Sequence, residues 1–269
     1  MVFTMWTEDA ALAAAAASAG IARIGPDLEI LGKRERQPEG DNRIADGRAS
    51  VLPGLRRVIG NARLHVRSNP LHRGLAQELE ACFAAGVTSV MLPMVRSVDA
   101  ARQVIAIVRG RAEIIVMVEH ADALPIVDEL AALDGVVELY VGANDLARSL
   151  GLATRFSVLG SGLIETVAEA AHRHGRGFGF FGLARPDDVS LPVPADLVYA
   201  EQARLGATNF VLARSFGATP QNIAVELDCA RARLASWRSA TSSARETAAA
   251  ALRRHCAAVL PDRSVRPAA

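Results

Sequence analysis

Cysteine is scarce in this 269-residue sequence. The three cysteines, Cys82, Cys229 and Cys256, lie far apart, are odd in number and form no C-x-x-C pair. This spacing predicts neither a disulfide framework nor a structural zinc site. We therefore expect a cytoplasmic protein that works in the reducing environment of the cytosol.

Long apolar runs and an excess of charge are also missing. No apolar run approaches the roughly eighteen residues of a membrane-spanning helix. The alanine-rich stretch near the start follows Glu8 and Asp9, whereas a secretory signal opens with basic residues. Thirty basic and twenty-nine acidic residues leave a formal net charge of +1, with no electrostatic footprint for nucleic acid or an anionic membrane. These absences favour a small molecule as the ligand.

Lysine occurs once, at Lys33, within a charged stretch that is typical of a mobile loop. An enzyme that forms a covalent imine with its substrate needs a desolvated lysine on a core strand, so we do not expect this chemistry. No serine lies in a G-x-S-x-G turn, and ester hydrolysis through a serine nucleophile therefore has no support.

Short runs rich in β-branched residues alternate with longer segments of helical periodicity. The eight predicted strands are residues 3–5, 21–29, 63–67, 89–94, 114–119, 136–142, 177–182 and 209–214. The eight predicted helices are residues 8–20, 53–59, 74–86, 98–110, 121–133, 162–175, 194–206 and 222–240. This alternation favours an α/β fold, a (β/α)8 TIM barrel, over a doubly wound sheet. We assign residues 1–238 to the barrel and 239–269 to a C-terminal extension, with a helix over 244–260 and an unstructured end.

The carboxyl ends of the strands build the active face of such a barrel. Charged residues stand at five of the predicted strand ends, namely Glu29, Arg67, Glu119, Asp145 and Arg214. Because all strands of a barrel end at the same rim, we expect these side chains to converge on one mouth.

Two of these carboxylates predict a metal site. A buried run of apolar residues leads straight into Glu119, although a carboxylate is costly to dehydrate, and Asp145 follows the next strand. Carboxylate oxygens at neighbouring strand ends suit Mg²⁺ or Mn²⁺. Arg67 could hold a substrate carboxylate or stabilise an oxygen that acquires negative charge. A bound Mg²⁺ or Mn²⁺ ion could stabilise the enolate of a 2-oxo acid. The alternative without metal is that Glu119 forms an ion pair with Arg67 or Arg214.

Five segments of the sequence resemble the HpcH/HpaI aldolase and citrate lyase beta-subunit family: VRSNPL, VMLPM, VMVE, DGVVELYVGANDLARSLG and GFGFFGLAR. The resemblance runs from about residue 20 to 217, and its most specific parts are the glutamate that ends the fifth strand and the G-x-N-D-L turn after the sixth. Members of this family are metal-dependent barrels that break or make carbon–carbon bonds next to a keto acid or an acyl-CoA. The resemblance also implies a homo-oligomer, a trimer or hexamer.

The resemblance assigns roles to particular residues. It implies that Glu119 and Asp145 bind the metal and that Arg67 contacts the carbonyl or carboxylate of the substrate. The backbone around the bound acid would be shaped by the three residues after the sixth strand, Gly142, Ala143 and Asn144.

One departure concerns the group that transfers the proton. The hydroxy-acid aldolases of this family have a histidine after D-x-E, whereas this sequence has Ile30 in the run DLEI. His120 also replaces a small hydroxyl residue that often follows the metal-binding glutamate. The candidates for proton transfer are therefore Glu29, His72 in the loop after Arg67, and a metal-bound water.

Two hypotheses follow. The first is a Mg²⁺- or Mn²⁺-dependent carbon–carbon lyase that acts on a 2-oxo acid or an acyl-CoA derivative. The second, motivated by the missing histidine, is a barrel that keeps the pocket and serves as a binding or accessory subunit.

The polar stretch at residues 30–48 is longer than an ordinary connection and predicts a lid or a subunit contact. Its arginines at 34, 36 and 43 could bind a phosphate or CoA.

Overall fold

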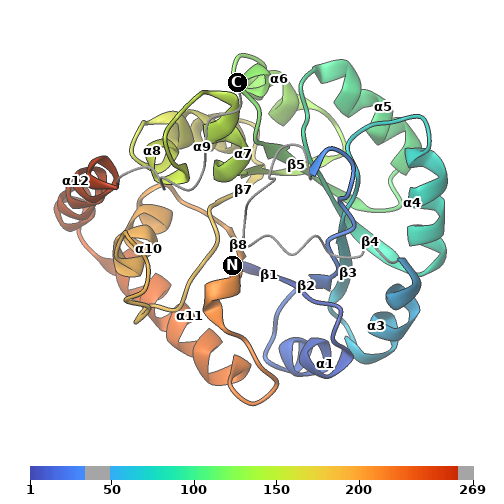
Figure 1. Ribbon diagram of the computed structural model, residues 1–269, viewed down its shortest axis with the longest axis horizontal. Coiled ribbons are helices and arrows are strands. Elements are labelled where there is room, and N and C mark those ends of the chain that lie inside the picture. Colours follow the sequence, from blue (N-terminus) through green and yellow to red (C-terminus); the bar gives the residue numbers. More distant parts are fainter. Residues whose placement is uncertain (34–48, 260–269) are drawn as a thin grey trace.

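A computed structural model of the chain describes residues 1–33 and 49–259. Its eight strands are β1 (Val2–Trp6), β2 (Arg23–Gly25), β3 (Arg63–Arg67), β4 (Val87–Leu92), β5 (Glu113–Val118), β6 (Val136–Val141), β7 (Gly177–Phe180) and β8 (Asn209–Val211). All pair in parallel, in the order β7-β6-β5-β4-β3-β2-β1-β8. The amide of Thr208 donates to the carbonyl of Phe178 at 2.8 Å, and the amide of Leu183 donates to that of Val211 at 2.8 Å, which joins β7 to β8. The predicted TIM barrel is confirmed (Figure 1).

Helices surround the strands as a ring (Figure 1). Those between successive strands, and after β8, are α1 (Ala10–Ser18), α3 (Leu52–Val58), α4 (Leu75–Ala84), α5 (Val98–Val108), α6 (Val127–Ala132), α7 (Ala143–Ser149), α8 (Arg155–Leu159), α9 (Leu163–Arg173), α10 (Ala195–Arg204) and α11 (Ile223–Ser239). Three 3₁₀ turns accompany them: η1 (Ala49–Val51), η2 (Ala121–Ala123) and η3 (Arg214–Phe216). Their apolar faces pack on the outside of the barrel and form the main core with the outward-facing strand residues.

Prolines explain two differences from the predicted elements. β2 ends at Gly25, and not at residue 29, because Pro26 has no N–H to continue a ladder. The predicted helix at 121–133 is divided into η2 and α6, with Pro125 between them, because proline cannot donate the hydrogen bond of a helix interior. Glu29 therefore lies beyond a regular strand.

The predicted C-terminal helix is present as α12 (Ser242–Ala258), which packs against α8 and α10. Leu252 and Cys256 are buried in this contact. The division at residue 238 and the role of the extension stay predictions. Residues 34–48, with the three arginines proposed to bind phosphate, and the end of the chain at 260–269 lie outside the described residues. Within the described ranges, no helix is long and apolar enough to cross a membrane.

The barrel interior differs between its two ends. Near the amino ends of the strands it is filled by buried polar side chains: Arg23 binds Glu138 at 2.7 Å and Glu113 at 3.1 Å, and Glu138 also accepts a hydrogen bond from Asn209. Nearer the carboxyl ends, a small apolar cluster includes Met117. Because the amino-terminal end is closed by this polar layer, any cavity must open at the carboxyl ends.

Candidate active site

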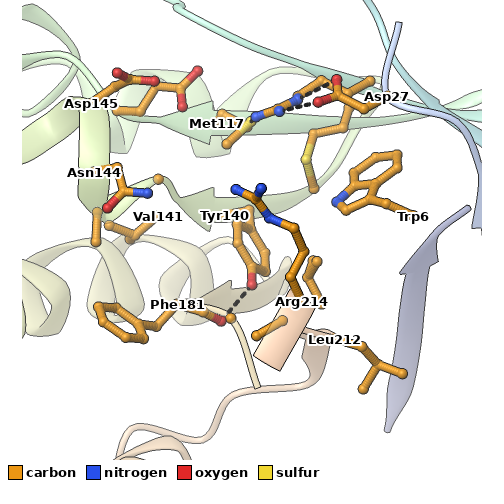
Figure 2. A pocket seen from close by; sticks show the side chains of 18 of the residues that line it. Trp6, Asp27, Met117, Tyr140, Val141, Asn144, Asp145, Phe181, Leu212 and Arg214 are labelled. Carbon is orange, nitrogen blue, oxygen red and sulfur yellow. Dashed lines mark hydrogen bonds and ion pairs between the residues drawn. The ribbon is translucent and has the colours of Figure 1, made fainter. Parts of the chain in front are cut away.

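A cavity of about 830 Å³ opens at the carboxyl ends of the strands. Four of the five charged residues that were expected to converge line it, namely Arg67, Glu119, Asp145 and Arg214. The residues of the turn after β6, Gly142, Ala143 and Asn144, also line it. The structure therefore brings most of the predicted site residues together in one place, and Figure 2 shows three of them, Asn144, Asp145 and Arg214.

Glu119 directly follows β5 and is 2% exposed. Its Oε1 accepts a hydrogen bond of 2.8 Å from the backbone N–H of Met94. Met94 has a φ of 52°, in the left-handed region, where a non-glycine residue costs about 1–3 kcal/mol. Burial and the charges of Glu29 and Asp145 raise the pKa of Glu119 to about 8, against the opposing effects of Arg67 and the Met94 N–H. At neutral pH this carboxyl group is therefore mainly protonated, and a cation bound beside it would favour its charged form.

Asp145 lies in the first turn of α7 and is 7% exposed. The sequence predicted a turn here, whereas the structure has a short helix of seven residues. Arg148, one turn further along α7, places Nη1 3.3 Å from Oδ1 of Asp145. Figure 2 shows Asp145 and Asn144 on the same side of the cavity. α7 therefore presents both side chains to the cavity from the end of β6.

Arg67, the last residue of β3, is held by a pair of hydrogen bonds to Asp27, which are the dashed lines that end at Asp27 in Figure 2. Its Nε donates to Oδ1 of Asp27 at 2.9 Å and its Nη2 donates to Oδ2, while Nη1 lies 3.9 Å from Sδ of Met117. Burial alone would raise the pKa of Asp27, but the positive charges of Arg67 and Lys33 hold it at about 2. Asp27 therefore stays ionised and fixes the plane of the guanidinium, with Nη1 turned toward the floor of the cavity.

The structure does not bring the two predicted proton-transfer residues into the cavity. Glu29 is 2% exposed, and its Oε2 lies 3.3 Å from Nε of Arg67. His72 places Nε2 3.2 Å from Oε1 of Glu78, and its Nδ1 accepts a hydrogen bond from the amide of Gly74. Both residues lie outside the cavity lining, so neither is placed to contact a bound substrate.

Lys33 is not where the sequence placed it. The predicted mobile loop position is wrong for this residue, which is 5% exposed, lines the cavity and forms an ion pair with Asp27. The reason is electrostatic, because Asp27 offers a partly buried carboxylate within reach of the ammonium group. Lys33 still lies outside the barrel strands, and its Nζ is engaged by that carboxylate.

Sequence reasoning missed two further residues of the cavity wall. Asp27, the first residue of the run DLEI, was assigned no role from the sequence, although it is the main partner of Arg67. Arg155 begins α8, a helix of five residues that is too short to show a periodic pattern. Its guanidinium stacks over the ring of Phe181, 5.4 Å from the centroid. The hydroxyl of Tyr140 donates to the carbonyl of Phe181 at 2.7 Å, which fixes the end of β7 (Figure 2).

The donor set fits a hard divalent cation. Glu119 and Asp145 both present carboxylates to the cavity, and their mutual repulsion is what a cation offsets. Across residues 1–33 and 49–259, no group of three or more histidine, cysteine or acidic residues forms a closed metal site. Mg²⁺ commonly takes one or two protein carboxylates and keeps its other positions for water and substrate. Glu119 and Asp145 suit that arrangement.

Known proteins share both sequence and fold with this chain. Residues 47–175 match the family model for HpcH/HpaI aldolase/citrate lyase. Over 76 residues the chain is 40% identical to the 4-hydroxy-4-methyl-2-oxoglutarate aldolase tasA of Hapsidospora irregularis, and the match spans only 28% of either protein.

Two solved structures have the same barrel. An HpcH/HpaI aldolase from Desulfitobacterium hafniense DCB-2 aligns with a TM-score of 0.60 at 19% identity, covering 79% of this chain and 85% of that one. A citrate lyase beta subunit from M. tuberculosis, in complex with oxaloacetate and magnesium, aligns with a TM-score of 0.59 at 22% identity, covering 85% and 96%. The predicted resemblance is therefore confirmed: this chain carries the sequence match, over residues 47–175, and the fold of the HpcH/HpaI aldolase/citrate lyase family.

Proposed function

We propose that this protein is a carbon–carbon lyase that acts on a 2-oxo acid and requires Mg²⁺ or Mn²⁺. The observation that carries the proposal is that Glu119, Asp145 and Arg67 line one cavity at the carboxyl ends of three strands. The family match supports it, as do a relative named as an aldolase and a structural neighbour that holds oxaloacetate and magnesium. The trimer or hexamer implied by the resemblance stays a prediction.

In this proposal, Glu119 and Asp145 hold the cation. When bound, the cation would supply Lewis acidity at the keto oxygen of the substrate. Met94 fixes Oε1 of Glu119 through its amide, so that this carboxylate is oriented before any ligand enters. Asn144, with Gly142 and Ala143, forms the adjacent wall of the cavity.

Arg67 would bind the carboxylate of the substrate or the oxygen that acquires negative charge. Asp27 occupies Nε and Nη2, which leaves the Nη1 side of the guanidinium for the substrate. Because this ion pair fixes the guanidinium, little ordering remains to be done when the substrate binds.

The proton acceptor is proposed to be water in the cavity. No histidine lines the cavity in the described part of the chain, and Glu29 and His72 are engaged outside it. The hydroxyl of Tyr140 is engaged as well, because it donates to the carbonyl of Phe181. Water is therefore the one of the three candidates from the sequence that fits this geometry.

The proposal is tested by deuterium exchange into the methyl group of pyruvate in D₂O with Mg²⁺, followed by NMR. We expect Asp145→Asn to lower the exchange rate by at least about 100-fold, because the amide removes the charge that holds the cation. Asp122→Asn is the matched control, since Asp122 is a half-exposed acid that pairs with Arg96 away from the cavity. Exchange that survives Asp145→Asn unchanged would reject the proposal.

The same experiment addresses the accessory-subunit hypothesis. A protein that binds pyruvate in the presence of Mg²⁺, measured by calorimetry, and yet catalyses no exchange would be a binding subunit. The absence of a histidine from the described cavity lining is the observation that keeps this second function in view.

A further inference from the structure

Two arginines share the cavity with the acidic pair. Arg155 is the first residue of α8 and Arg214 the first of η3, so they come from segments that follow different strands, β6 and β8. Both line the cavity. Figure 2 shows the side chain of Arg214 extending into it. Partial burial, and then the positive charge of Arg214, lower the pKa of Arg155.

The surroundings of Arg155 hold its guanidinium without neutralising it. The group stacks 5.0 Å from the ring centroid of Phe156 and 5.4 Å from that of Phe181. The backbone of Phe181 has a left-handed φ of 56°, and its carbonyl accepts a hydrogen bond from the hydroxyl of Tyr140, which fixes its position. Among the described residues, no carboxylate lies within ion-pair distance of Arg155, in contrast to Arg67 with its partner Asp27.

Both arginines are exposed, and like charges gathered around one cavity still repel one another; an anion between them offsets the repulsion. The volume of about 830 Å³ is near the upper end of small-molecule pockets, roughly 300–1,000 Å³, and leaves room beyond a three-carbon acid. We propose that Arg155 and Arg214 form a second anion-binding site, which holds a carboxylate or phosphate group remote from the 2-oxo acid group of the ligand.

This inference rests on the proposed function only in placing the 2-oxo acid group at Glu119 and Asp145. The remote anion has two possible sources with the same chemistry. One is the second carboxylate of a 2-oxo dicarboxylic acid, and the other is a phosphate of an acyl-CoA. The two sources are separated by the choice of probe.

The first probe pair is 2-oxoglutarate and 2-oxobutanoate, which differ by the remote carboxylate. We expect isothermal titration calorimetry with Mg²⁺ to show roughly tenfold or greater preference for 2-oxoglutarate. Arg155→Gln and Arg214→Gln should each weaken 2-oxoglutarate binding by roughly ten- to hundredfold and leave 2-oxobutanoate within about twofold. Arg96→Gln is the matched control, because Arg96 is an exposed arginine that pairs with Asp122 outside the cavity.

The second probe is acetyl-CoA. If a phosphate is the source, the two substitutions weaken acetyl-CoA binding and the two acids bind alike. The proposal is wrong if neither substitution changes the binding of 2-oxoglutarate or acetyl-CoA, or if 2-oxobutanoate is weakened as much as 2-oxoglutarate. Arg155→Lys, which keeps the charge and loses the planar fork, should give an intermediate affinity and serves if Arg155→Gln does not fold.

These measurements need no turnover. A protein that fails the pyruvate exchange test and still prefers the remote anion through Arg155 and Arg214 would retain this site and lose the lyase assignment. A protein that exchanges pyruvate and shows no preference for the remote anion would keep the lyase assignment and lose this second site.

Discussion

His65 is a buried histidine in the middle of β3. Its side chain is fully buried, its Nδ1 lies 3.0 Å from Oγ of Ser89, and its ring stacks on Trp6 with centroids 4.8 Å apart. Burial, together with the positive charges of Arg23 and Arg67, lowers the pKa of His65 well below its usual value. His65 is therefore neutral in the folded protein and acts as a packing residue.

This neutral histidine predicts a loss of stability in mild acid. Below about pH 6.5 the unfolded chain protonates His65 while the folded protein does not, so the free energy of unfolding falls as pH falls, by up to about 1.4 kcal/mol per pH unit. Urea unfolding between pH 7.5 and 5 should show this slope in the wild type and a smaller one in His65→Gln. The exposed His255 offers a control, since His255→Gln should keep the wild-type slope. Parallel curves for all three proteins would contradict the account.

At the scale of elements, Gly142 at the start of α7 packs closely against Glu119 at the end of β5. A Cβ added at Gly142 would lie 2.5 Å from Oε2 and 2.7 Å from Cβ of Glu119. Both distances are too short for atoms that are not bonded, so only glycine lets the backbone of α7 approach this carboxylate. The spacing between Glu119 and Asp145 therefore depends on one residue without a side chain.

Gly142→Ala should accordingly damage activity more than stability. We expect at least a tenfold loss of Mg²⁺-dependent pyruvate exchange, because displacement of a site residue by about 1 Å can cost 100-fold in rate. Gly54→Ala is the matched control: a Cβ at Gly54 in α3 meets open space, and alanine favours a helix by about 1 kcal/mol. The measurements are the pyruvate exchange rate and the thermal unfolding midpoint of each variant. Equal exchange in both would show that Gly142 is not needed for the site.

The length of an element decides whether the sequence predicts it. Periodicity and turn residues predict the eight strands and most of the helices, because each long element has a buried face with a repeating pattern. The short α7 and α8 have no such pattern, so Arg155 was not recognised as part of the cavity wall. Strand ends predict that Glu119 and Asp145 meet at the rim. The pair of Arg67 with Asp27 could not be predicted, because it depends on how the chain turns after Pro26.

At the scale of the whole molecule, the barrel interior is divided into a closed half and an open half. Arg23 pairs with Glu113 and Glu138 near the amino ends of the strands, and Arg63 also pairs with Glu113, so that two positive charges offset two negative ones in that half. Breaking a buried ion pair leaves an uncompensated charge, which makes this layer costly to open. The carboxyl half instead holds the cavity with its unequal charges, acidic at Glu119 and Asp145 and basic at Arg155 and Arg214. This separation directs an anionic ligand and a cation to one rim.

The position of a bound cation tests the account most directly. In a crystal grown with Mn²⁺, anomalous scattering should place one manganese ion in the cavity, within about 2.5 Å of a carboxylate oxygen from both Glu119 and Asp145. Glu119→Gln crystals grown in the same way should show that position empty or weakly occupied. Manganese bound elsewhere in the wild type, with no ion shared by Glu119 and Asp145, would contradict the account.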